Sequence, residues 1–199
     1  MTAARAGSTA ASGIGSPFDL DDERAYQSWR ERKLDLRARR VDDLLVELRD
    51  PCALAPAERD ALLARIARTN MALYRTPDRR EDPALARALG AQLGLVRLDA
   101  NWLADEDGIS RIAVSAHAEA GQPGGGRADF IPYTEHAIRW HTDGYYHPDE
   151  RRIHGMVLHA VRPAAAGGVN RLIDHELAYI ALRDESPLLV RALMRPDAM

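Results

Sequence analysis

An imidazole and a carboxylate stand two residues apart within residues 139–146, which read RWHTDGYY. In a β-strand, side chains two apart leave the same face, so His141 and Asp143 could bind one metal ion between them. An imidazole and a carboxylate are two of the three ligands of the 2-His-1-carboxylate triad, which holds non-haem Fe(II) and leaves positions open for a co-substrate and O2. The motif predicts an iron site at these two residues, with a third ligand elsewhere.

The His-x-Asp motif is short, and the chain contains a second copy, His147-Pro148-Asp149. Proline cannot donate to a sheet ladder, so the second copy is expected in a polar turn. Around the first copy, residues 138–143 alternate apolar and polar side chains, which favours a strand. The alternative for the first copy is a histidine at the end of a strand, followed by an aspartate that caps a turn at Gly144.

The residues downstream predict a strand, a turn and two helices. Residues 153–161 (IHGMVLHAV) have the length and apolarity of a buried strand, and residues 162–168 (RPAAAGG) have the composition of a turn. Asp174 is the expected N-cap of a helix that runs through Leu182. Ser186-Pro187 is the expected start of another short helix.

These segments together resemble the first half of the catalytic domain of taurine dioxygenase-like (TauD/TfdA-type) enzymes, to which γ-butyrobetaine hydroxylase is related. The resemblance covers roughly residues 95–199. It rests on residues 131–134 (IPYT), 140–144 (WHTDG), 158–163 (LHAVRP), 167–170 (GGVN) and 174–176 (DHE). Such enzymes are Fe(II)- and 2-oxoglutarate-dependent oxygenases with a double-stranded β-helix core. By this resemblance, His141 and Asp143 are iron ligands, and Asn170 occupies the position whose side chain lies against the 2-oxoglutarate carboxylate.

The expected fold class is α+β, with N-terminal helices packed on a partial double-stranded β-helix, a jelly-roll-like sheet. We expect residues 1–17 to form a disordered lead-in, residues 18–94 a helical region, and residues 95–199 the first half of the oxygenase domain. The expected helices span Asp21 to about Leu48, Pro56 to about Tyr74, and Pro83 to about Gly94. The other expected elements are short strands at 96–98 and 109–114 and a glycine-rich loop at 121–126.

The resemblance also implies a second histidine and an arginine for the far carboxylate of 2-oxoglutarate, both well downstream of the His-x-Asp motif. Only 56 residues follow Asp143 (199 − 143), and they match the elements that precede those two residues. A truncated product of a longer gene is therefore expected. His154, His159 and His175 are candidates for a third ligand, but a packed or solvated histidine is the commoner role at each place.

Composition limits the classes of partner that the chain is expected to bind. A net charge of −3 and a pI of about 6.2 give no reason to expect nucleic acid or an anionic membrane as partner. The single cysteine, Cys52, excludes an internal disulfide and fits a reducing cytoplasm. The expected partners are a small-molecule substrate and O2, and a homo-oligomer is possible.

Two hypotheses for function follow. The first is an Fe(II)- and 2-oxoglutarate-dependent hydroxylase of a small molecule, with the 199 residues alone inactive. The second is a non-catalytic fragment or interaction protein built on half of an oxygenase core. A weaker third is a hydrolase that uses a different metal, which would not require 2-oxoglutarate.

Overall fold

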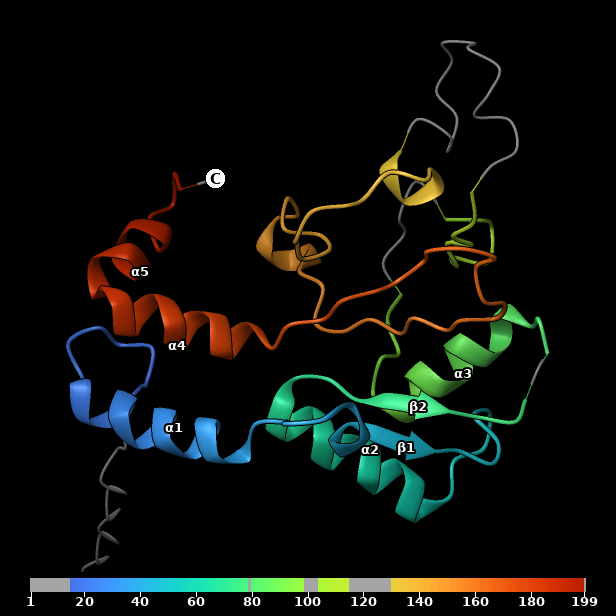
Figure 1. The fold of residues 1–199 in the computed structure, drawn as a ribbon, viewed down its shortest axis with the longest axis horizontal. Coiled ribbons are helices and arrows are strands. Elements are labelled where there is room, and N and C mark those ends of the chain that lie inside the picture. Colours follow the sequence, from blue (N-terminus) through green and yellow to red (C-terminus); the bar gives the residue numbers. More distant parts are fainter. Residues whose placement is uncertain (1–14, 79, 99–103, 115–129, 199) are drawn as a thin grey trace, which may run out of the picture. The chain divides into compact units, whose positions relative to one another are not determined.

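The computed structural model describes residues 15–78, 80–98, 104–114 and 130–198 (Figure 1). The expected lead-in, for its first 14 residues, and the glycine-rich loop at 121–126 lie outside the described residues. The chain divides into two units. Unit 1 comprises residues 1–47, 60–75 and 166–199, and unit 2 comprises residues 48–59 and 76–165. Among the described residues, no helix has the length and apolarity to cross a membrane.

Three helices of unit 1 begin where the sequence supplies a cap. Helix α1 (Glu23–Leu36) has Asp22 as its N-cap, whose carboxylate accepts the amide of Ala25. Helix α4 (His175–Glu185) is capped by Asp174 and helix α5 (Pro187–Leu193) by Ser186, so both expected starts are confirmed. A side-chain oxygen at the N-cap satisfies an amide that has no partner within the helix.

Unit 1 also contains the only sheet among the described residues. Strands β1 (Leu45–Glu47) and β2 (Leu73–Arg75) are parallel, with Leu45 opposite Leu73. Helix α2 (Pro56–Thr69) joins them, as parallel strands require a crossover. The residue that follows the helix, Asn70, has a left-handed φ of 58°, a conformation that asparagine adopts more readily than most residues.

The first expected helix is wrong beyond Leu36. The carboxylate of Asp43 accepts the amides of Arg39 and Arg40 at 2.8 and 3.0 Å, so these amides are not free to continue a helix. These two hydrogen bonds also lower the pKa of Asp43. The second expected helix stops short of Tyr74, which is part of β2.

A cluster of polar side chains around the buried Lys33–Asp174 ion pair joins α1 to the start of α4. Lys33 and Asp174 are each 6% exposed, and Lys33 Nζ lies 2.7 Å from Asp174 Oδ2. The same ammonium contacts the carboxylate of Glu176 and donates to the carbonyl of Arg68 at 3.0 Å. Asn70 Nδ2 donates to Asp174 Oδ1 at 2.8 Å and to Glu176 Oε2 at 2.9 Å. The Lys33–Asp174 contact is an ion pair without hydrogen-bond geometry, since Asp174 Oδ2 has no hydrogen-bond partner. We call these four side chains, Lys33, Asn70, Asp174 and Glu176, the charge cluster.

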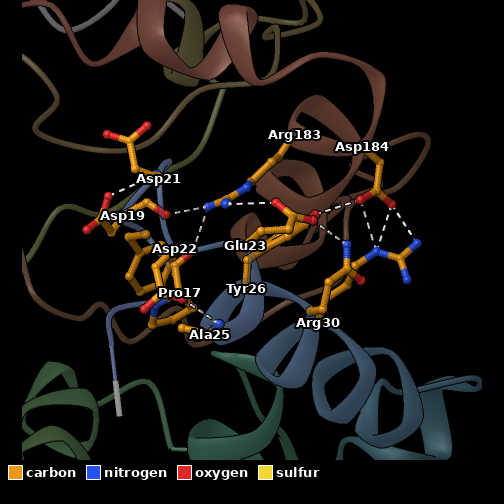
Figure 2. A network of polar contacts seen from close by, with 12 residues as sticks. Pro17, Asp19, Asp21, Asp22, Glu23, Ala25, Tyr26, Arg30, Arg183 and Asp184 are labelled. Atoms are coloured by element: carbon orange, nitrogen blue, oxygen red, sulfur yellow. Dashed lines mark hydrogen bonds and ion pairs between the residues drawn. The ribbon is translucent and has the colours of Figure 1, made fainter. Parts of the chain in front are cut away.

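A second buried cation, Arg183 of α4, holds the segment before α1 (Figure 2). Its Nη1 donates to the carbonyls of Pro17 and Asp19 at 2.9 and 3.1 Å and to the hydroxyl of Tyr179 at 3.0 Å. Its guanidinium lies over the Tyr26 ring, 3.9 Å from the centroid. Burial, and then a 2.6 Å hydrogen bond to Asp184, raise the pKa of the Tyr26 hydroxyl. Helices α1 and α4 therefore pack through both aromatic and charged contacts.

Unit 2 is built on helix α3 (Pro83–Gln92), whose expected start after Asp82 is confirmed. Leu85 and Leu89 on this helix are fully buried, at 0% and 1% exposed. The side chain of Gln92 accepts the amide of Leu54 at 2.7 Å and donates to the carbonyl of Pro51 at 2.9 Å. The remaining elements are two short 3-10 helices, η3 (Ile131–Tyr133) and η4 (Asp149–Arg151).

The strands expected in unit 2 do not form, which corrects the prediction of a partial β-helix sheet in these residues. Residues 96–98, 109–114, 138–143 and 153–161 are not in strands. Large apolar side chains on residues 138–143 and 153–161 are exposed, such as Trp140 at 65% and Leu158 at 53%. A strand requires a hydrogen-bonded neighbour, and none pairs with them among the described residues. The α+β class itself is confirmed.

Arg183→Lys is expected to lower the free energy of unfolding by about 2–3 kcal/mol, because one ammonium cannot reproduce the hydrogen bonds of Nη1 together with the packing of the planar guanidinium on the Tyr26 ring. Arg191→Lys is the matched control. Arg191 lies 3.5 Å from Asp21 with both side chains exposed, and such pairs contribute roughly 0–1 kcal/mol. Urea unfolding of the two variants measures the difference, and equal destabilisation would contradict the role assigned to Arg183.

Candidate metal centre

His141 and Asp143 face each other in unit 2. His141 Nε2 lies 3.5 Å from Asp143 Oδ1, and the two side chains are 40% and 48% exposed. Donor–metal bonds for nitrogen and oxygen are about 2.0–2.2 Å, so donors at this separation can share one ion. The expected convergence of the two side chains is therefore present, although residues 138–143 do not form the strand from which it was derived.

The backbone orients the imidazole. His141 Nδ1 lies 2.7 Å from the carbonyl oxygen of Arg139. A carbonyl oxygen only accepts, so Nδ1 is the donor of this hydrogen bond. In the neutral ring, Nε2 then carries the lone pair, and it is Nε2 that faces Asp143. A hydrogen bond of this kind at the second ring nitrogen is what metal-binding histidines usually make.

Gly144 makes the turn that follows Asp143. Its φ is 69°, a left-handed value that costs other residues energy. A Cβ at this position would also lie 2.6 Å from Ile153 Cδ1 and 2.8 Å from His147 Cδ2. The carbonyl of Gly144 accepts the amide of His147 at 2.9 Å. The turn at Gly144 was part of the alternative derived from the sequence, and the structure contains both this turn and the facing pair.

The described residues contain no group of three or more His, Cys, Asp or Glu side chains that could hold a metal ion. His154 and His175 are exposed, and His159 is half-buried. The expected polar turn at the second His-x-Asp copy is confirmed, because Asp149 begins η4. The described part of the chain therefore supplies two metal donors in contact with each other and does not add a third.

Asn170 lies in unit 1 and the His141–Asp143 pair in unit 2, so each is described by itself. Asn170 is exposed and follows Gly167 and Gly168, whose φ angles are 67° and 69°. Its Nδ2 lies 3.4 Å from the Gly168 carbonyl, which is long for a hydrogen bond. The amide is thus not engaged in a strong internal contact.

A comparison with protein families gives one result. The model of the taurine catabolism dioxygenase TauD, TfdA family matches residues 33–198. The chain belongs to the TauD/TfdA family. The resemblance derived from the sequence is confirmed, and it extends further toward the N-terminus than residue 95. No curated protein and no solved structure matches the chain.

Membership places the chain in a family whose members are generally dioxygenases with a jelly-roll fold. The match includes α1 from Lys33 onward and the whole charge cluster. No role was predicted for Lys33 from the sequence. The signal was present, because Tyr26, Trp29, Lys33 and Leu36 share one stripe at helical spacing. No role was predicted for the Arg139 carbonyl either. Every residue carries a backbone carbonyl, so the sequence does not distinguish this one.

Gly144→Ala is expected to destabilise the protein more than Gly94→Ala. Gly94 has a φ of 93°, and a Cβ there would meet nothing within 4 Å, so its substitution adds only backbone strain of about 1–2 kcal/mol. At Gly144 the contacts with Ile153 and His147 add to that strain. Urea unfolding of both variants, with Mn(II) affinity measured by calorimetry, gives the comparison. Equal losses of stability with unchanged Mn(II) affinity would contradict the role of the Gly144 turn.

Proposed function

We propose that this protein is an Fe(II)- and 2-oxoglutarate-dependent oxygenase that hydroxylates a small molecule. The observation that carries the proposal is the pair of facing donors, His141 Nε2 and Asp143 Oδ1, 3.5 Å apart in a chain of the TauD/TfdA family. One nitrogen and one carboxylate oxygen are donors that suit Fe(II). Family membership supports a dioxygenase in general terms, and the iron, the co-substrate and the hydroxylation are the proposal.

Each residue of the site has a distinct part in this proposal. His141 and Asp143 would hold the metal, and the Arg139 carbonyl keeps His141 Nε2 available by retaining the proton on Nδ1. Asn170 would donate from its amide to a carboxylate oxygen of 2-oxoglutarate. When bound, Fe(II) and 2-oxoglutarate supply the oxidative chemistry, in which O2 converts 2-oxoglutarate to succinate and CO2 and one oxygen atom enters the substrate. The chain supplies binding and orientation.

Tyr145 and Tyr146 lie beside the metal donors in sequence and are 60% and 66% exposed. Their rings pack edge to face at 5.3 Å, and Tyr146 packs on the imidazole of His147 at 4.7 Å. Exposed aromatic side chains offer an apolar contact surface. We include this surface in the proposal as a contact for the substrate.

The full-length protein is expected to consume 2-oxoglutarate only with Fe(II). His141→Ala and Asp143→Ala should each remove nearly all succinate formation, because few protein ligands hold the ion and each loss weakens binding. Asn170→Ala should chiefly raise the 2-oxoglutarate requirement. His136→Ala is the control, since His136 is an exposed histidine of unit 2 with no role in the proposed site. Full activity in either ligand variant would rule out the assigned site.

The second candidate is a non-catalytic fragment or interaction protein. It is favoured by the absence of a third donor beside His141 and Asp143 in the described part of the chain. The DNA downstream of codon 199 separates the two candidates. An open frame that encodes a histidine and then an arginine favours the oxygenase, whereas a stop codon favours the second candidate.

Residues 1–199 expressed alone are expected to associate and to bind Fe(II) weakly. The large apolar side chains Trp140, Met156 and Leu158 are 65%, 62% and 53% exposed, and exposed apolar surface of this kind promotes association. Light scattering, Fe(II) titration and succinate assay test this expectation. A monodisperse monomer that binds Fe(II) tightly and forms succinate would show that a histidine within the chain completes the site.

A further inference from the structure

The segment that carries Asn170 is fixed to unit 1 at its C-terminal end. Residues 169 and 171–173 make no hydrogen bond or ion pair within the described part of the chain, and Val169 and Leu172 are 80% and 60% exposed. The next residue, Asp174, is 6% exposed and caps α4 by accepting the amide of Glu176 at 3.0 Å. Asp174 is therefore the nearest fixed point downstream of Asn170, four residues away.

Asp174 is in turn held by side chains from two other elements. Lys33 of α1 places its ammonium 2.7 Å from Asp174 Oδ2 and against Glu176, and Asn70, at the end of α2, donates to both carboxylates at 2.8 and 2.9 Å. A buried carboxylate and a partly buried one this close to each other repel unless cations or donors lie between them. Lys33 and Asn70 supply those groups, and so determine where the first turn of α4 lies.

We propose that Lys33 and Asn70 are positioning residues for Asn170 and thereby set the affinity for 2-oxoglutarate. The inference rests on the proposed function, in which Asn170 contacts that co-substrate. Four residues of extended chain span at most about 13–14 Å, so a change in the direction of the chain at Asp174 displaces Asn170. A binding group must be held within about 0.5 Å of its productive position to be effective. Neither positioning residue needs to touch the co-substrate.

The structure offers a matched control on the same pair of helices. Arg30 of α1 binds Asp184 of α4 with both its Nε and Nη2, at 2.6–2.9 Å. This pair also joins α1 to α4, but it lies ten residues beyond Asp174, in the last turn of α4, and its side chains are 30% and 34% exposed. Loss of this pair weakens the packing of α1 on α4 without touching the charge cluster.

The experiment compares Asn70→Gly, Lys33→Met and Arg30→Met in the full-length protein. Glycine tolerates the φ of 58° at position 70, so Asn70→Gly removes the side-chain amide without backbone strain. If Lys33→Met fails to fold, the result for Asn70→Gly decides the test. Calorimetry measures 2-oxoglutarate binding to the Mn(II)-loaded protein. Asn70→Gly and Lys33→Met are expected to weaken binding by about 10-fold or more, as loss of outer-shell partners commonly does. The rate of succinate formation at saturating 2-oxoglutarate should be unchanged, and Arg30→Met should alter neither quantity.

The outcomes separate this inference from the proposed function. If Asn170→Ala weakens 2-oxoglutarate binding while Asn70→Gly and Lys33→Met behave like Arg30→Met, the positioning role is wrong and the proposed function stands. If all three α1 and α2 variants weaken binding equally, the effect is general packing and the inference is again wrong. If the unmodified protein does not bind 2-oxoglutarate, or Asn170→Ala has no effect, the role proposed for Asn170 fails and the inference fails with it.

Discussion

Burial of the Lys33 ammonium between two carboxylates is the constraint on which the arrangement of unit 1 depends. An isolated charge in a protein interior costs several kcal/mol of desolvation. Here Lys33 compensates Asp174 and Glu176, and Asn70 and the Arg68 carbonyl satisfy further polar atoms. Because the partners come from α1, from the end of α2 and from the start of α4, any displacement of one element leaves a buried charge uncompensated. The cluster therefore specifies where these three elements meet.

The helix starts could be predicted because their signals are local. Asp82, Asp174 and Ser186 each bond a backbone amide two residues further on, and this interaction needs no distant partner. The end of α1 was not predicted, since it depends on the Asp43 carboxylate, which captures the amides of Arg39 and Arg40. The buried position of Lys33 was missed for the opposite reason, because its partners lie far away in the sequence. A lysine among arginines and glutamates predicts a solvent-exposed side chain, because the local sequence does not show the distant carboxylates.

Strands were predicted least well, because a strand forms only where another segment pairs with it. Alternation of apolar and polar side chains across residues 138–143 indicates a segment with two faces, but it contains no information on a neighbouring strand. The observed pair, β1 and β2, is joined by a helix of 14 residues, so its partners could not be found from local periodicity. Even so, His141 and Asp143 lie side by side as expected. Their contact depends on a spacing of two residues, on the Arg139 carbonyl and on the turn at Gly144, and none of these requires a sheet.

The two parts of the proposed site consequently depend on different ranges of the sequence. The metal donors are oriented within six residues, from Arg139 to Gly144, so a short motif is enough to predict them. Asn170 has no comparable local support, because within the described residues its side chain makes only the 3.4 Å contact with Gly168, and residues 171–173 are exposed. Its position follows from Asp174, and the position of Asp174 follows from Lys33 and Asn70, more than 100 residues earlier in the chain. A motif can therefore identify the residue proposed to meet the co-substrate, whereas the proposed placement of that residue depends on a buried ion pair that a motif does not contain.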